Sequence, residues 1–91
     1  MQTRETAYRE RAILVGLATP STSRVRVEDY LQELMLLADS AGAVVVHQIL
    51  QERQRMDPAT FIGSGKADEI AWLVEQQKID IVIFDDDLSP V

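Results

Sequence analysis

Apolar residues fall into blocks of two kinds along this chain, and the two kinds alternate. Residues 11–18 (RAILVGLA) and 79–84 (IDIVIF) carry short continuous apolar runs, and residues 43–51 begin with a β-branched run. Continuous runs of this length are typical of strands buried on both faces, as in a parallel sheet. The brief stretch TFI at 60–62 predicts one further strand, and the short connection before it favours an antiparallel return.

Between these strands the apolar period changes to that of a helix. Apolar residues recur at steps of three and four over 27–41 and again over 65–78, so each segment has one apolar face. Gly42 stands where a left-handed C-cap is expected, and Ser64 is expected to cap the second helix. The sequence therefore predicts an α/β fold, with a small four-stranded, mainly parallel sheet and two covering helices.

The ends of the chain have a different character from its middle. Residues 1–10 are polar and without a period, so we expect a flexible arm, followed by one α/β unit over 11–91. Ser89-Pro90 is a standard helix start, and we expect the chain to be truncated at the start of that helix. A docking surface would then be bare, and we expect self-association or lower stability than in an extended chain.

Composition narrows the class of protein. The chain has 91 residues, no cysteine, and no apolar run of membrane-spanning length, so we expect a cytoplasmic domain without a membrane span. Nine basic against fifteen acidic side chains give a net charge of -6. Proteins that bind RNA across a whole face are usually basic, so contact with RNA must here be local. The candidate phosphate contacts are Arg24, Arg26, Arg53, Arg55 and Lys66.

The segment Gly63-Ser64-Gly65-Lys66 resembles part of a nucleotide-binding loop. A Walker loop reads G-x-x-x-x-G-K-[ST], which would need glycine at Thr60 and a hydroxyl at Ala67. The second mismatch removes the ligand for magnesium, so we expect no nucleotide hydrolysis at this loop.

Two interpretations of this loop remain. Free N–H groups at a helix N-terminus, helped by Lys66, would hold an anion such as an RNA phosphate, with Gly63, Ser64, Gly65 and Lys66 as the contacts. The interpretation that we favour is a strand-to-helix turn in which Gly63 or Gly65 has a positive φ.

Acidic residues follow the last predicted strand. Asp85 and Asp86, with Asp87, would lie at the carboxyl end of that strand, where open α/β sheets bind ligands, and carboxylates are also ligands of magnesium. A solvated turn is the simpler interpretation, and we expect no metal site. His47 and Trp72 are interpreted as structural, the second as a packing residue of the second helix.

Two blocks of sequence carry a family signature. Residues 57–66 (DPATFIGSGK) and 84–90 (FDDDLSP) occur in this order around the second helix. Together they resemble the N-terminal domain of the HflX family of translational GTPases, and the resemblance covers residues 11–91. Asp87 replaces a commoner glutamate.

This resemblance implies a function for the longer protein. An HflX-like protein is a GTPase that binds the large ribosomal subunit and its rRNA and helps to dissociate ribosomes. GTP and Mg²⁺ would be bound by another domain, so this chain would be a ribosome-binding and regulatory module, neither an enzyme nor the holder of a cofactor. Its partners would include the remaining domains of its own chain. Two alternatives stay open: a small-molecule or nucleotide-binding domain using residues 63–66 and 85–87, and a structural scaffold.

Overall fold

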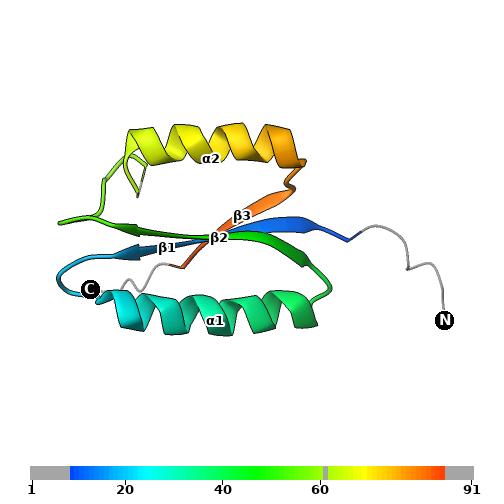
Figure 1. Ribbon diagram of the computed structural model, residues 1–91, viewed down its shortest axis with the longest axis horizontal. Coiled ribbons are helices and arrows are strands. Elements are labelled where there is room, and N and C mark those ends of the chain that lie inside the picture. The colour runs from blue at the N-terminus through cyan, green and yellow to red at the C-terminus, as the bar shows by residue number, and fades with distance from the viewer. Residues whose placement is uncertain (1–8, 61, 86–91) are drawn as a thin grey trace.

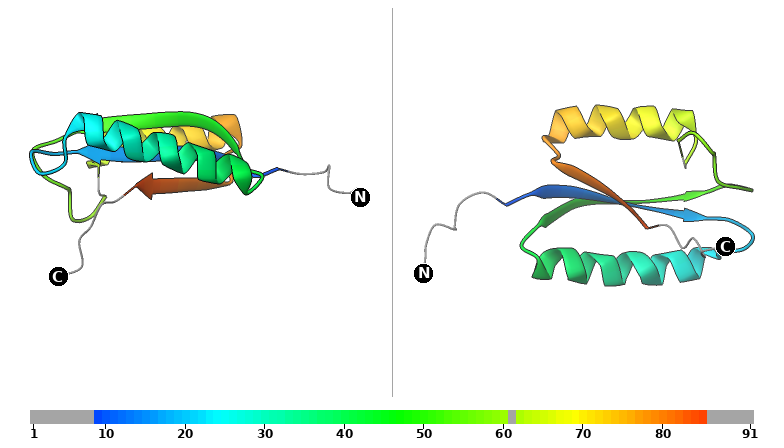
Figure 2. Two further views of the ribbon diagram at one scale, coloured as in Figure 1. Left: turned by 90° about the horizontal axis from the view of Figure 1, so that it is seen from below. Right: turned by 180° about the vertical axis from the view of Figure 1, so that it is seen from behind.

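The computed structural model describes residues 9–60 and 62–85, which form three strands and two helices. In chain order these are β1 (Arg11–Ala18), α1 (Arg24–Ser40), β2 (Val44–Glu52), α2 (Ser64–Gln77) and β3 (Ile81–Asp85). The strands are all parallel, and β1 lies between β2 and β3 (Figure 2, left). The predicted α/β class, parallel sheet and two helices are confirmed, but the sheet has three strands and not four.

The missing strand is the one predicted at 60–62. Thr60 lies in a turn and Ile62 in a bend, and the Ile62 N–H donates to the Thr60 carbonyl at 2.7 Å. Ile62 is apolar because it fills the core from a loop: it is 1% exposed and packs with Ile70 of α2. The predicted strand was therefore wrong. A three-residue apolar stretch has the same pattern whether it forms a strand or a loop with a buried side chain.

The two helices cover opposite faces of the sheet (Figure 1). On the α2 face, Ile13 and Val15 of β1 pack with Ile62 and Ile70. On the α1 face, Leu14 and Ala18 of β1 pack with α1 and with the neighbouring strands. Both faces of β1 are therefore buried, which is why its sequence is a continuous apolar run.

Gly16 allows α1 to approach β1 closely. A Cβ atom at this position would lie 2.5 Å from Val27 Cγ1 and 3.1 Å from Leu31 Cδ1, both on α1. Such distances are shorter than van der Waals contact, so a larger residue would push α1 away from the sheet.

Side chains and glycines define the helix ends. The Ser23 hydroxyl accepts from the Arg26 N–H at 3.3 Å, so α1 begins at Arg24, one turn before the predicted start. Gly42 has φ +90°, as predicted for the residue that ends this helix. Gly63, with φ +96°, is the N-cap of α2, and Ser64 is its first residue rather than its cap.

The residues just before β1 are bonded to the chain around the start of β2. Arg9 Nε donates to the Gly42 carbonyl at 3.0 Å, and the Glu10 carbonyl accepts from Val44, so the end of the predicted arm is bonded to the start of β2.

The helices carry two further observations. Trp72, which was expected to pack, is 59% exposed on α2. Neither helix in the described residues combines the length and apolarity needed to cross a membrane.

Candidate functional site: the carboxyl edge of the sheet

The parallel strands all end at one edge of the sheet, and both helices begin there. This edge carries every basic residue that the sequence singled out. Arg24 and Arg26 lie in the first turn of α1, Arg53 and Arg55 directly follow β2, and Lys66 lies in the first turn of α2. Residues separated by more than forty positions are thus gathered at the edge where open α/β sheets bind ligands.

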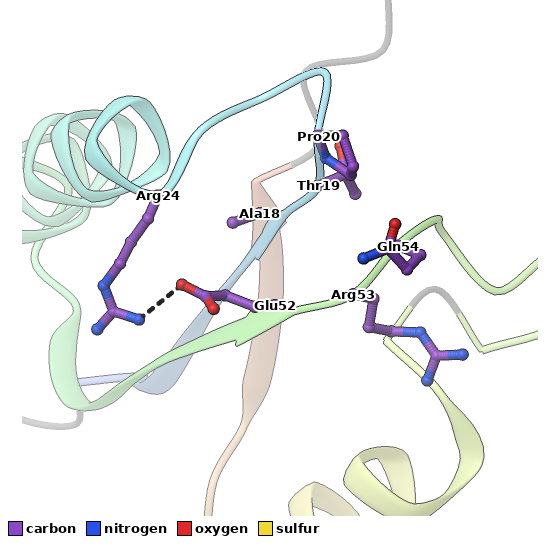
Figure 3. Close-up of a pocket in the computed structure, with 7 residues that line it drawn as sticks. All are labelled: Ala18, Thr19, Pro20, Arg24, Glu52, Arg53 and Gln54. Carbon is purple, nitrogen blue, oxygen red and sulfur yellow. Dashed lines mark hydrogen bonds and ion pairs between the residues drawn. The ribbon is translucent and has the colours of Figure 1, made fainter.

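A hollow of about 480 Å³ opens at this edge between the ends of β1 and β2 and the start of α1 (Figure 3). Its volume falls within the range typical of small-molecule pockets. The residues that line it are Ala18, Thr19, Pro20, Arg24, Glu52, Arg53 and Gln54.

Arg24 lines one side of the hollow and forms two ion pairs. Its Nη1 lies 3.0 Å from Glu52 Oε2 at the end of β2, and its Nε lies 3.2 Å from Glu28 Oε2, one turn along α1. The hydrogen bond to Glu52, followed by the attraction of that carboxylate, raises the pKa of Arg24. Both carboxylates offset its charge, so Arg24 presents less positive potential to an anion than an unpaired arginine would.

The side chain of Arg26 contacts Tyr30, one turn further along α1. Its Nε donates to the Tyr30 hydroxyl at 3.0 Å, and its guanidinium carbon lies 5.8 Å from the Tyr30 ring centroid. The contact with the aromatic ring leaves the charge of the guanidinium intact.

Arg53 turns away from Arg24 and reaches the opposite side of β2 (Figure 3). Its Nε donates to the Arg55 carbonyl at 3.3 Å, and its Nη1 donates to the Ile62 carbonyl at 3.4 Å. A Cβ added at Gly63 would collide with the same Nη1. Arg53 therefore ties the loop after β2 to the start of α2. The Arg55 side chain is exposed and has no carboxylate partner within residues 9–60 and 62–85.

The side chains of Asp57 and Thr60 accept hydrogen bonds from backbone N–H groups in the segment before α2. Asp57 Oδ1 accepts from Ala59 N–H at 2.8 Å and from Thr60 N–H at 3.0 Å, and these bonds, that of Thr60 first, lower the pKa of Asp57. Thr60 Oγ1 in turn accepts from the Gly63 N–H at 3.0 Å. Asp57 and Thr60 of the DPATFIG block thus have local structural roles, since their side chains set the path of the chain into α2.

The glycine loop is therefore only partly available to an anion. The Gly63 N–H is already bonded to Thr60, and Lys66 Nζ lies 2.9 Å from Glu69 Oε1. Ser64 and Gly65 are exposed at the start of α2. Positive φ at Gly63 agrees with the expected turn, whereas Gly65 has no positive φ.

The predicted acidic ligand edge is described only in part. Asp85 is the last residue of β3, so it stands at the expected carboxyl edge, while Asp86 and Asp87 lie outside the described residues. No group of three His, Cys, Asp or Glu side chains in the described segments is arranged to hold a metal ion.

Sequence reasoning missed the partner of Arg24 and the role of Arg53. Glu52 is separated from Arg24 by the whole of α1 and β2, and only the parallel return of the chain brings them together. A signal existed in the pattern, because in a strand-helix-strand unit the start of the helix and the end of the second strand share one edge.

The sequence of this chain is similar to one protein family and to several known proteins. Residues 28–91 match the family described as GTP-binding GTPase N-terminal. The chain is 39% identical over 90 residues to the GTPase HflX of Flavobacterium psychrophilum, covering 99% of this chain and 22% of that protein. It is 40% identical over 81 residues to the GTPase HflX of Escherichia coli K12, covering 89% of this chain and 18% of that protein.

A third relative has the same name. The GTPase HflX of Thermofilum pendens is 42% identical over 60 residues, which are 66% of this chain and 14% of that protein. The chain spans about a fifth of the length of the first two relatives. Because the family match covers most of the chain and includes both signature blocks, this chain belongs to the GTP-binding GTPase N-terminal family found in HflX proteins.

Proposed function

We propose that this chain is the α/β module of an HflX-like GTPase, and that it contacts the large ribosomal subunit and takes part in dissociating ribosomes. Support comes from the family match and from relatives that are each named GTPase HflX. In this proposal GTP and Mg²⁺ are bound by another part of the full-length protein, and the present chain contributes binding and regulation rather than catalysis.

The observation that carries a contact with rRNA is the gathering of basic side chains at the carboxyl edge. The whole chain has a net charge of -6, which opposes a broad attraction to RNA. A local contact needs a few cations that project from one edge, and α1, the loop after β2, and α2 supply them there. Arg55 is the favoured contact, because its exposed side chain has no carboxylate partner in the described residues.

The nucleotide-binding alternative receives less support from the same geometry. A phosphate cradle needs free backbone N–H groups and a lysine that reaches into it. Here the Gly63 N–H is bonded to Thr60, and the Lys66 ammonium is paired with Glu69. A purely structural scaffold remains the second alternative, and it differs from the proposal in predicting no dependence of ribosome binding on the edge cations.

Binding of the chain to purified large ribosomal subunits over a series of salt concentrations tests the proposal. We expect weak binding that falls as salt rises. We expect Arg55→Gln to reduce the slope of log affinity against log salt by about one.

Lys78→Gln is the matched control. Lys78 is exposed and basic like Arg55, but it lies at the end of α2, at the opposite edge of the sheet. Its replacement changes the net charge equally and should leave the slope unchanged. Equal effects of the Arg55 and Lys78 changes would contradict the edge assignment, and the absence of binding at low salt would favour the scaffold alternative.

A further inference from the structure

Trp72 is a large apolar side chain of α2 that the fold leaves exposed. It is 59% exposed and belongs to neither apolar cluster of the core. Ile70, Leu73 and Val74 supply the face of α2 that packs against the sheet. At 3.6 residues per turn, Trp72 lies about 160° around the helix from Ile70, so it points away from the sheet. The packing of the described residues therefore gives no reason for an aromatic residue at this position.

Carboxylates lie one turn of helix on either side of Trp72. Asp68 precedes it by four residues and Glu75 follows it by three, and both residues are exposed. Residues at these spacings are neighbours on a helix surface, about 5–6 Å apart between their Cβ atoms. Neither carboxylate has a basic partner within residues 9–60 and 62–85, whereas the neighbouring Glu69 is paired with Lys66. The indole ring thus stands between two negative charges that the fold does not neutralise.

We propose that this surface, the Trp72 face of Asp68, Trp72 and Glu75, binds an arginine-bearing basic segment of another protein. A guanidinium is attracted by the face of an aromatic ring, and tryptophan attracts it most strongly. Stacked on Trp72, the guanidinium would lie within one helical turn of both carboxylates. Its planar fork donates two parallel hydrogen bonds to a carboxylate, which a lysine ammonium cannot do.

The charges on this face select a basic protein segment over other partners. A nucleic-acid base stacked on Trp72 would bring its phosphates against Asp68 and Glu75, which repel them. An apolar partner would desolvate the same two carboxylates without pairing them, which is costly. A basic segment pairs them, and the net charge of -6 on the chain also attracts it over a longer range.

The Trp72 face is separate from the basic edge of the sheet. α2 forms the outer layer on its side of the sheet, and Trp72 lies in the middle of this helix (Figure 1). Lys66, the basic residue that α2 contributes to the edge, lies in the first turn. A partner on the Trp72 face and rRNA at the edge would therefore use different side chains. The inference is independent of the proposed ribosomal function.

The fluorescence of Trp72 tests the proposal directly, because this is the only tryptophan of the chain. The probe is a short capped oligoarginine peptide, titrated into the 91-residue chain at low salt. We expect a saturable change in the emission of Trp72, with an affinity that falls as salt rises. A capped oligoglutamate peptide of equal length should leave the emission unchanged. An unchanged emission with oligoarginine would overturn the proposal.

Fluorescence anisotropy of a labelled oligoarginine peptide measures the same binding without using the tryptophan. At physiological salt we expect Trp72→Ala to weaken binding by about two- to fivefold, which corresponds to an exposed contact between a cation and an aromatic ring. The double change Asp68→Asn and Glu75→Gln should weaken it by about fivefold or more, because both charge pairs are lost. All three residues are exposed, so these variants should fold as the unchanged chain does.

Asp29→Asn with Glu33→Gln is the matched control for the double change. Asp29 and Glu33 are exposed carboxylates on α1, which covers the opposite face of the sheet, and their replacement alters the net charge equally. At physiological salt, charges separated by more than about 8 Å are largely screened, so this variant should bind within about twofold of the unchanged chain. Equal weakening by the two double variants, or unchanged binding by Trp72→Ala, would overturn the proposal.

A second copy of the chain is the other source of cations, because each copy has a basic edge. Sedimentation of the chain without peptide distinguishes this occupant. Self-association of the chain should be the same in Trp72→Ala as in the unchanged chain. Self-association that Trp72→Ala abolishes would assign the Trp72 face to a second copy and would overturn the choice of partner.

Discussion

Gly63 has φ +96° and ψ 148°, a backbone conformation that residues with a side chain adopt at a cost. Its N–H is bonded to Thr60 Oγ1, and the guanidinium of Arg53 occupies the space where a Cβ would stand. Both the dihedral angles and the neighbour therefore require glycine. Gly65 has neither requirement, since its φ is not positive and, apart from its chain neighbours and the nearby backbone of α2, no atom lies within 4 Å of a Cβ placed there.

This difference predicts opposite effects for two similar substitutions. Gly63→Ala should lower the free energy of unfolding by about 1–3 kcal/mol, the usual cost of a strained backbone position. Gly65→Ala, in the first turn of α2, should leave it unchanged or raise it by up to about 1 kcal/mol, because alanine favours the helix. Urea unfolding of both variants measures the contrast. Equal destabilisation by the two changes would contradict the role given to Gly63.

Individual residues of the site were predicted with mixed success. The sequence indicated a glycine turn, and the positive φ of Gly63 confirms it, because the need for glycine is a local property of the backbone. The bond between Arg53 and the Ile62 carbonyl was not predicted, since it joins two sides of a loop whose path depends on packing. Whether the candidate residues contact a phosphate stays a prediction.

At the scale of elements, the closest helix-to-strand contact is that of α1 with β1. Gly16 is the residue of β1 that lies beneath Val27 and Leu31. A helix that packs at this distance buries Val27 to 2% exposure and Leu31 to 3%. The position of α1, and with it that of Arg24 beside Glu52, depends on this small residue.

Gly16→Ala should therefore destabilise the chain by overpacking, by about 1–3 kcal/mol in the free energy of unfolding. The added methyl would meet Val27 Cγ1 first, so the same change should cost less when Val27 is already alanine. A double-mutant cycle by chemical denaturation measures this coupling. Strict additivity of the two changes would show that Gly16 is not the point of closest contact.

Elements were predicted best where the pattern was long. Both helices and the strands at either end of the chain lie where the apolar period placed them, within a few residues. The error at 60–62 arose because a stretch of three residues is too short to show a period. Ile62 is buried against α2 from a loop and does not belong to a strand of the sheet. The start of α1 was placed late because Ser23, and not the first apolar residue, caps the helix.

At the scale of the whole molecule, the glycine loop of residues 63–66 resembles part of a phosphate loop, but it lacks the groups that nucleotide hydrolysis needs. Ala67 stands where a hydroxyl would hold magnesium, and Lys66 is paired with Glu69. We expect the 91-residue chain to release no phosphate from GTP or ATP above background in the presence of Mg²⁺. Lys66→Ala should give the same trace as the unchanged chain. Turnover that copurifies with the chain and disappears in this variant would contradict the assignment.

The sequence by itself determined the class of fold, both helix segments, three of the four predicted strand segments, the glycine turn and the family, because each depends on the order of residues over short distances. Continuous apolar runs require burial on both faces, and a helical period requires one apolar face, whatever the rest of the chain does. Only the tertiary structure decided the number and order of the strands, the pairing of Arg24 with Glu52, and the meeting of the basic residues at one edge. These features depend on which distant segments become neighbours. Strand pairing and helix packing settle that choice through contacts between residues far apart in the chain, about which local periodicity contains no information.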